Sequence, residues 1–225
     1  MKILVFDTCF NKTYIVLRED NNILASKIIE SDSRNYHSVY LIPEICNILK
    51  ENKILIKDLY AIGVDIGPGS FTGIRAGITI ARVLAQQANI KLAGIESLRI
   101  LAKINNKKNN TLVMTDARKN NVYIAKYDIN NNSYLKPILE AKENIEKHIN
   151  SKDTIITDIS TGIFLKEKGY SSINYEEHDN MTGIHLSDIV YSELKENSTD
   201  FNWAKVKPLY IQPPSITKPK EHKYV

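Results

Sequence analysis

The chain has 225 residues, 43% of them hydrophobic, which suffices for one large or two ordinary domains and excludes disorder as the main state. Its net charge of +4 lies wholly in residues 205–225, so the body is neutral and has no overall preference for nucleic acid. Cys9 and Cys46 have no CxxC spacing, which argues against a disulfide framework and a Cys-based zinc site and favours a cytoplasmic protein. No run approaches the roughly 18–20 apolar residues that span a membrane.

The N-terminal half predicts a mixed sheet built in the order βββαβαβ. Apolar runs separated by turn residues predict three strands in an antiparallel meander, followed by helices that alternate with strands. This order is typical of a ribonuclease-H-like unit, in which crossover helices extend a three-stranded meander. The expected strands are 2–6, 14–17, 23–30, 59–66 and 91–95, and the expected helices are 37–50 and 71–89.

A second unit is expected after the polar stretch 105–110, which has the composition of a linker. A shift of 109 positions aligns Asp7 with Asp116 and Tyr14 with Tyr123, each in a strand, turn, strand pattern that suggests duplication. The expected strands are 112–114, 122–125 and 154–157, and the expected helices are 161–168 and 186–195. We therefore predict an N-terminal lobe at 1–104, a smaller C-terminal lobe at 105–203, and a C-terminal segment with a basic tail at 204–225.

A glycine-rich run, GPGSFTG at 67–73, joins a predicted strand to a predicted helix. Such a turn could offer backbone N–H groups and a helix N-terminus to a phosphate. The run lacks the Lys-Ser/Thr pair of a Walker A loop and the spacing of a dinucleotide fingerprint. The alternative is a tight turn in which Pro68 fixes φ and Ser70 or Thr72 caps the helix.

Two predicted helices have surfaces typical of close packing. Gly73, Gly77 and Ala81 recur every fourth residue and leave a flat stripe, although glycine costs roughly 1 kcal/mol in a helix. The element that packs on this stripe could be the chain's own sheet or first helix, or a helix of another subunit. The helix at 37–50 has an apolar arc wider than one sheet face requires. This favours a helical interface between subunits.

Candidate catalytic groups are few. The five histidines include no pair at the i, i+4 spacing of a helical metal site. Asp7, at the end of the first strand, could hold a metal or phosphate-bound cation as in actin-like ATPases, but the hairpin at 8–12 has no glycine with which to wrap phosphates. Asp116 and Arg118 form either a structural ion pair or turn, or a functional pair.

Short motifs along nearly the full length resemble those of the TsaB (YeaZ) family. The most specific motif is GPGSFTG-x-R, and Asp-Thr, His-Ser, Asp-Ala-Arg and Pro-Leu-Tyr-Ile support it. The resemblance places motif residues at Asp7, His37, Gly67, Pro68, Gly69, Ser70, Phe71, Thr72, Arg75, Asp116, Arg118 and Tyr210. The chain departs from the family pattern at Val39, Asn121 and Gln212, where a polar residue, Glu and Arg are common.

The resemblance implies two ribonuclease-H-like lobes of the actin-like ATPase superfamily and a non-catalytic role. The expected partners are a TsaD-like catalytic subunit, a TsaE-like ATPase, a second copy when TsaD is absent, and tRNA mainly through the complex. ATP and metal are expected on the TsaD-like subunit, with none bound by this chain alone. The product is N6-threonylcarbamoyladenosine at position 37 of tRNAs reading codons that start with A. The implied interface comprises Leu41, Ile42, Ile45, Leu49, Gly73, Gly77, Ala81 and Leu84.

Two other functions stay open at this stage. The chain could be an actin-like ATPase or carbamoyl transferase in its own right. A peptidase is the weaker alternative, since the sequence offers no nucleophile or metal set for it.

Overall fold

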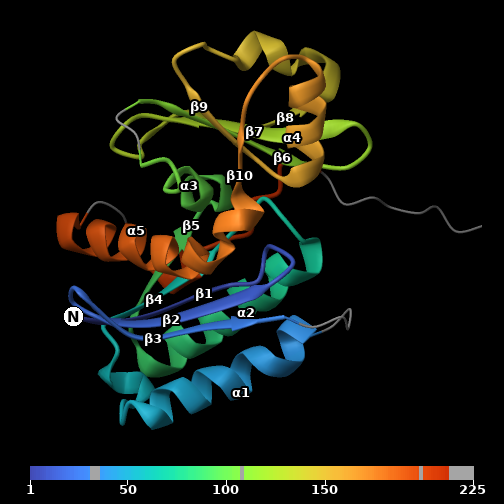
Figure 1. Ribbon diagram of the computed structural model, residues 1–225. Helices are drawn as coiled ribbons and strands as arrows, with labels where there is room; N and C mark the ends of the chain where they lie inside the picture. The colour runs from blue at the N-terminus through green and yellow to red at the C-terminus, as the bar shows by residue number, and fades with distance from the viewer. Residues whose placement is uncertain (31–35, 107–108, 198–199, 213–225) are drawn as a thin grey trace, which may run out of the picture.

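A computed structural model describes residues 1–30, 36–106, 109–197 and 200–212, and it contains two lobes (Figure 1). Each lobe has a five-stranded sheet, ordered β3-β2-β1-β4-β5 in the first and β8-β7-β6-β9-β10 in the second. In both sheets an antiparallel meander is extended by parallel strands. The prediction of two ribonuclease-H-like lobes is therefore confirmed. Asp7 and Asp116 end the corresponding strands β1 and β6, as the suggested duplication requires.

The first sheet forms where the sequence predicts it. Every residue of β1 from Ile3 to Asp7 is buried, since helices cover both faces of this central strand. The elements of this half are β1 Lys2–Asp7, β2 Thr13–Glu19, β3 Asn22–Ile29, α1 Tyr36–Glu51, β4 Ala61–Asp65, α2 Phe71–Ala88, β5 Lys91–Ile95 and α3 Ser97–Ala102. The six residues of α3 are too few to show helical periodicity, and no helix was expected there.

The second sheet has one long strand that the sequence does not predict. This strand, β8, lies at an edge, contains Pro137 and is mostly exposed or half-buried, so it lacks the apolar alternation of a covered strand. The elements of this half are β6 Thr111–Asp116, β7 Asn121–Tyr127, β8 Ser133–Ala141, β9 Thr154–Thr157, α4 Ile159–Glu167, β10 Ile173–Asn174 and α5 Thr182–Glu196. None of the helices among the described residues is long and apolar enough to cross a bilayer.

Two helices, α3 and α5, lie between the sheets, and each packs on the sheet formed by the other half of the chain (Figure 1). Helix α5 packs on the first sheet, where Val190 and Leu186 join Ile3 and Val5 in one core. Helix α3 packs on the second sheet through Leu98 and its neighbours. The expected division at residues 104 and 203 therefore does not follow the packing, because α5 belongs by its contacts to the first lobe.

Helices α1 and α2 cover the opposite face of the first sheet. Helix α2 begins after Ser70, whose Oγ accepts the Gly73 N–H at 3.3 Å, and ends at Asn89 in the left-handed conformation. The two helices therefore leave their outer sides available on one side of the molecule.

Candidate functional site

The glycine-rich turn packs directly on the backbone of the β1–β2 turn. The Ser70 N–H donates to the Cys9 carbonyl oxygen at 2.8 Å. A Cβ on Gly69 would lie 2.5 Å from that oxygen, and Gly67 has a φ of +100°, which favours glycine. The Ser70 and Gly73 N–H groups are thus already bonded within the protein. This arrangement supports the interpretation as a tight turn and leaves neither N–H for a phosphate.

The small-residue stripe of α2 faces inward, so the interface predicted on it is wrong at these positions. A Cβ on Gly73 would lie 1.8 Å from the Thr8 carbonyl oxygen, and one on Gly77 would lie 2.5 Å from Thr8 Oγ1. The Thr8 hydroxyl donates to the Gly73 carbonyl oxygen at 2.7 Å, and Ala81 is fully buried. The stripe therefore seats α2 on its own sheet, where no second subunit can reach it.

The interface residues predicted on α1 divide in the same way. Leu41, Ile45 and Leu49 are buried in the core between α1 and the sheet, whereas Ile42 is 48% exposed. Leu84 of α2 is half-buried against the same core. Of the eight predicted interface residues, Ile42 alone has a largely exposed side chain. Helical periodicity grouped the predicted interface residues correctly by helix face, but it did not indicate which face of each helix packs on the sheet.

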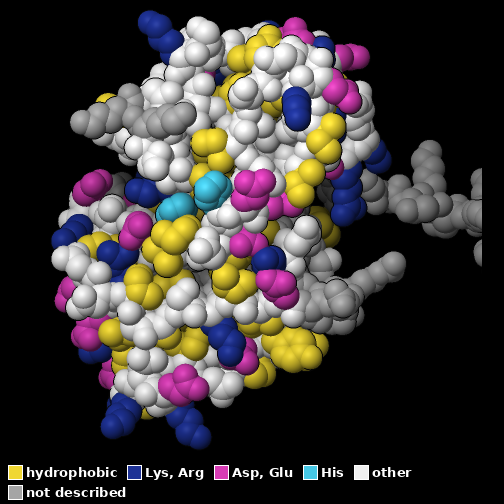
Figure 2. All heavy atoms as spheres, viewed as in Figure 1, with side chains coloured by type: hydrophobic (Ala, Val, Ile, Leu, Met, Phe, Trp, Pro, Cys, Tyr) yellow, Lys and Arg dark blue, Asp and Glu magenta, His cyan; other side chains and the backbone are white. Residues whose placement is uncertain are grey.

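A different set of apolar side chains is exposed on these helices. Val39 and Ile42 lie three positions apart on α1 and are 58% and 48% exposed, and Tyr40 stands beside them. On α2, Val83 is 52% exposed. Hydrophobic side chains also gather on the surface of the lower lobe over β3 and α1 (Figure 2). The outer side of α1 and α2 therefore carries large apolar groups that nothing in the chain's described part covers.

A groove of about 380 Å³ runs along the outer side of α2. Arg75 Nε donates to the Tyr210 hydroxyl at 2.7 Å, and its guanidinium lies 3.8 Å from the centroid of the Phe71 ring. Three motif residues, separated by up to 139 positions, thus meet here. Arg82 and Trp203, which the sequence analysis missed, also line the groove, and no lining residue is acidic. The groove combines aromatic surface with two guanidinium groups.

The Asp116 and Arg118 motif forms a turn. Asp116 accepts the Arg118 N–H at 3.2 Å and pairs with Lys142 at 3.1 Å. Its own N–H donates to Asp158, which caps α4. These contacts support the structural interpretation. His37 stands in the first turn of α1, and its side chain lies outside the described part of the chain.

An aromatic pair lies beside the turn that follows β1. The rings of Phe10 and Tyr175 are 5.6 Å apart, and both side chains pack on the core under the second sheet. Burial, followed by the charge of Asp158, raises the pKa of the Tyr175 hydroxyl well above its usual range. The glycine-free hairpin therefore presents the hydrophobic side chain of Phe10 beside the end of β1.

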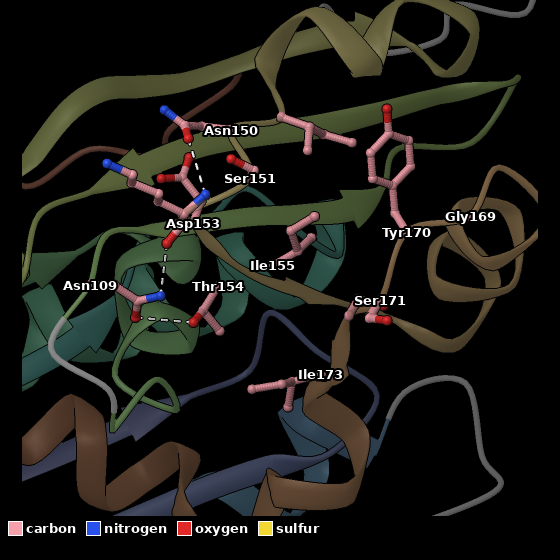
Figure 3. A pocket seen from close by; sticks show the side chains of 13 residues that line it. Asn109, Asn150, Ser151, Asp153, Thr154, Ile155, Gly169, Tyr170, Ser171 and Ile173 are labelled. Carbon is pink, nitrogen blue, oxygen red and sulfur yellow. Dashed lines mark hydrogen bonds between the residues drawn. The ribbon is translucent and has the colours of Figure 1, made fainter.

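A cavity of about 690 Å³ in the second lobe is lined mainly by uncharged polar groups (Figure 3). Asn109 donates to the Lys152 carbonyl oxygen at 2.9 Å and accepts from the Thr154 hydroxyl at 3.1 Å. Asp153 is paired with Lys126. The contacts of Asn109, Asp153 and Thr154 therefore tie β9 and the turn before it to the neighbouring strands of the second sheet.

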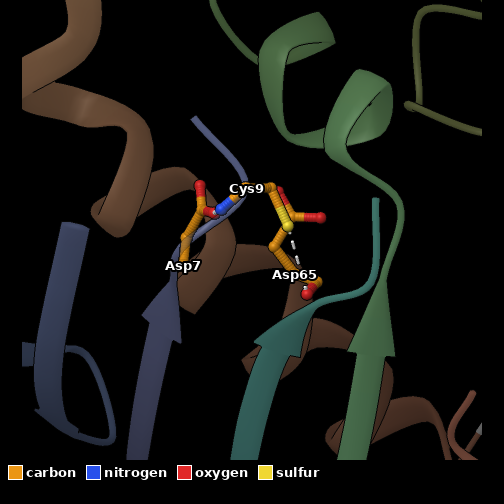
Figure 4. A group of neighbouring side chains, drawn as sticks. All are labelled: Asp7, Cys9 and Asp65. Carbon is orange, nitrogen blue, oxygen red and sulfur yellow. Dashed lines mark hydrogen bonds between the residues drawn. The ribbon is translucent and has the colours of Figure 1, made fainter. Parts of the chain in front are cut away.

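Asp7 and Asp65 lie at the carboxyl ends of the adjacent parallel strands β1 and β4, with Cys9 beside them (Figure 4). All three side chains are buried. Burial raises the pKa of Asp65 to about 6, although hydrogen bonds from Ser97 and Gly67 lower it. Burial and then the charge of Asp65 raise the pKa of Asp7 well above its usual range. The sequence analysis missed Asp65, which could have been found by pairing the ends of the two buried strands.

Asp65→Asn is expected to stabilise the metal-free protein at pH 8 by about 3 kcal/mol, since burial raises the pKa of Asp65 from 3.8 to about 6 and each pKa unit corresponds to about 1.4 kcal/mol. The folded pKa of Asp65 lies above its unfolded value, so its carboxylate opposes folding at high pH and stops doing so as pH falls to about 4. Urea unfolding should show a gap between variant and parent that shrinks from pH 8 to pH 4. Exposed Glu51→Gln is the control, and a gap independent of pH would contradict the prediction.

Comparisons with known proteins match this chain to a TsaD sequence model, to proteins named TsaB and to the structure of a YeaZ protein. The sequence model described as "TsaD: tRNA N6-adenosine threonylcarbamoyltransferase" matches residues 22–174. Proteins named tRNA threonylcarbamoyladenosine biosynthesis protein TsaB are 33% identical, over 58% of this chain in Bacillus subtilis strain 168 and 59% in Escherichia coli strain K12. Each alignment spans 57% of the relative, so the chain covers little over half the length of these curated relatives. The structure of YeaZ from Pseudomonas aeruginosa superimposes with a TM-score of 0.74 over 93% of this chain and 99% of that one, at 17% identity.

Proposed function

Since this chain belongs to the TsaB (YeaZ) family, we propose that it is a non-catalytic subunit of tRNA threonylcarbamoyladenosine biosynthesis that binds a TsaD-like catalytic subunit. The observation that carries this proposal is the uncovered apolar side of α1 and α2, with Val39, Ile42 and Val83 exposed. Large exposed apolar groups on neighbouring helices are typical of protein interfaces. The product is N6-threonylcarbamoyladenosine at position 37 of tRNAs reading codons that start with A.

The groove on α2 also supports partner binding at the outer side of α1 and α2. A partner helix carrying acidic side chains would find Arg75 and Arg82 beside the aromatic surface of Trp203 and Tyr210. Arginine and aromatic residues commonly anchor interfaces, because their planar groups bury area and donate hydrogen bonds at low entropic cost. Without the TsaD-like subunit, a second copy of the chain is expected to occupy this face as a homodimer.

The non-catalytic role is supported by the β1–β2 turn. Phe10 packs on Tyr175 there, and the Ser70 N–H is bonded to Cys9. ATP and metal for catalysis are therefore expected on the TsaD-like subunit, with a TsaE-like ATPase completing the machinery. Residues 1–204 carry no net charge, so tRNA is expected to bind mainly through the complex. The proposed compartment is the cytoplasm.

Depletion of this chain in its host cells is the direct test. We expect tRNA nucleoside analysis to show loss of N6-threonylcarbamoyladenosine, and the purified chain to co-elute with its TsaD-like partner from a sizing column. Restoration by the wild-type chain is the control. Normal modification after depletion, or separate elution of the two proteins, would overturn the proposal. ATP turnover by the isolated chain, lost in Asp7→Ala, would favour a catalytic role instead.

A further inference from the structure

The Asp7, Cys9 and Asp65 cluster contains two buried oxygen atoms without partners. Oδ1 of Asp7 accepts the Cys9 N–H at 2.7 Å, and Oδ1 of Asp65 accepts the Gly67 N–H and the Ser97 hydroxyl at 2.7 Å each. Oδ2 of each aspartate is buried and has no hydrogen-bond partner among the described residues. A buried carboxylate oxygen left in this state is costly, so the cluster requires a positive group.

The protein supplies no such group from the residues that the structure describes. No lysine, arginine or histidine in this part of the chain forms an ion pair with Asp7 or Asp65. The charge must therefore be offset by a proton shared between the carboxyl groups or by a bound cation. Both possibilities fit two carboxyl groups at the ends of adjacent parallel strands.

The thiol favours a bound cation. A shared proton involves the two carboxyl groups alone, whereas the Cys9 sulfur, which contacts the Asp65 carbonyl oxygen at 3.5 Å, adds a third donor that a metal ion would use. One oxygen from each aspartate and the Cys9 sulfur all lie within 4.8 Å of one another, so a small inward movement of these side chains would let one ion contact all three. A thiolate with carboxylates is a donor set for zinc-type ions, whereas magnesium and calcium select oxygen ligands only.

We propose that Asp7, Cys9 and Asp65 bind a zinc-type divalent metal ion that ties the end of β1 to the end of β4. The ion is structural, since its ligands are buried and no substrate could reach them. The absence of a CxxC pair excludes sites built from several cysteines, but this site needs only one. Metal binding displaces protons from the ligands, so the affinity rises with pH.

The test uses tag-free, chelator-stripped full-length chain titrated with cobalt(II) at pH 8. We expect a near-ultraviolet thiolate-to-cobalt charge-transfer band that saturates at a single equivalent and disappears when zinc is added. Cys9→Ser should abolish the band. Asp65→Asn should lower the affinity for cobalt(II) at least tenfold. Exposed Cys46→Ser is the matched control and should leave the band unchanged.

A second measurement does not depend on the thiol signal. At a hundredfold excess over the parent Kd, zinc should raise the Tm of the parent by roughly 5 °C and that of Asp65→Asn by at most about half as much. Absence of both the band and the Tm shift in the parent would overturn the proposal and assign the cluster to a shared proton. A band that survives in Cys9→Ser would overturn it by placing the ion elsewhere. Neither result bears on partner binding, so the proposed function is tested separately.

Discussion

Gly73→Ala is expected to lower the free energy of unfolding by about 3 kcal/mol or more, despite a helix-propensity gain of about 1 kcal/mol. The added Cβ would lie 1.8 Å from the Thr8 carbonyl oxygen, which belongs to the backbone and cannot rotate away. Relief requires a shift of α2 from the sheet. Urea unfolding followed by circular dichroism measures the loss.

Two variants of the same helix serve as controls for this prediction. Thr72→Ala changes an exposed neighbour and should alter stability by no more than about 0.5 kcal/mol. Gly77→Ala should be intermediate, since its Cβ would meet Thr8 Oγ1, a side-chain atom, at 2.5 Å. If Gly73→Ala were as stable as Thr72→Ala, the close approach of α2 to the β1–β2 turn would be wrong.

The double variant Ile42→Glu, Val83→Glu is expected to weaken binding to the TsaD-like partner at least about a hundredfold without unfolding the chain. Both side chains are about half exposed, so the glutamates stay hydrated in the isolated protein. In a complex they would be buried as unpaired charges. Isothermal titration of the partner gives the change in Kd.

The matched control places the same charge on another exposed apolar residue. Ile163 of α4 is 57% exposed and lies on the second lobe, so Ile163→Glu should leave the Kd unchanged. Equal loss in the control would indicate a nonspecific effect of charge. Unchanged binding in the double variant would show that the partner uses a different face. A drop in Tm for the double variant alone would instead indicate lost packing.

Local pattern predicted the fold well because most of its strands are short apolar runs bounded by turn residues. Strand β4 and helix α2 appear at the expected places for this reason. Edge strand β8 was missed because half-exposed strands need no apolar alternation. The exchange of α3 and α5 between lobes rests on contacts between distant segments, which periodicity does not report.

For the candidate site, the sequence predicted which residues share one face of a helix or one end of a strand, but not what those residues contact. The spacing of Gly73, Gly77 and Ala81 identified a close approach correctly, but the approaching element is Thr8 of the same chain. Likewise, Asp7 was singled out from its position at a strand end, whereas its pairing with Asp65 depends on β1 and β4 being neighbours. Sequence spacing defines which residues share a face, and tertiary packing decides what that face meets.

The position of α5 has a consequence for the order in which the protein is completed during synthesis. The strands of the first sheet leave the ribosome early, yet the helix that covers the face lined by Ile3 and Val5 is not made until Thr182–Glu196. Until then this face is open to water and to other chains, a state prone to aggregation. A nascent or truncated chain ending near residue 104 would therefore be the species most dependent on chaperones. This face of the first sheet is covered only after α5 has been synthesised and has packed on it.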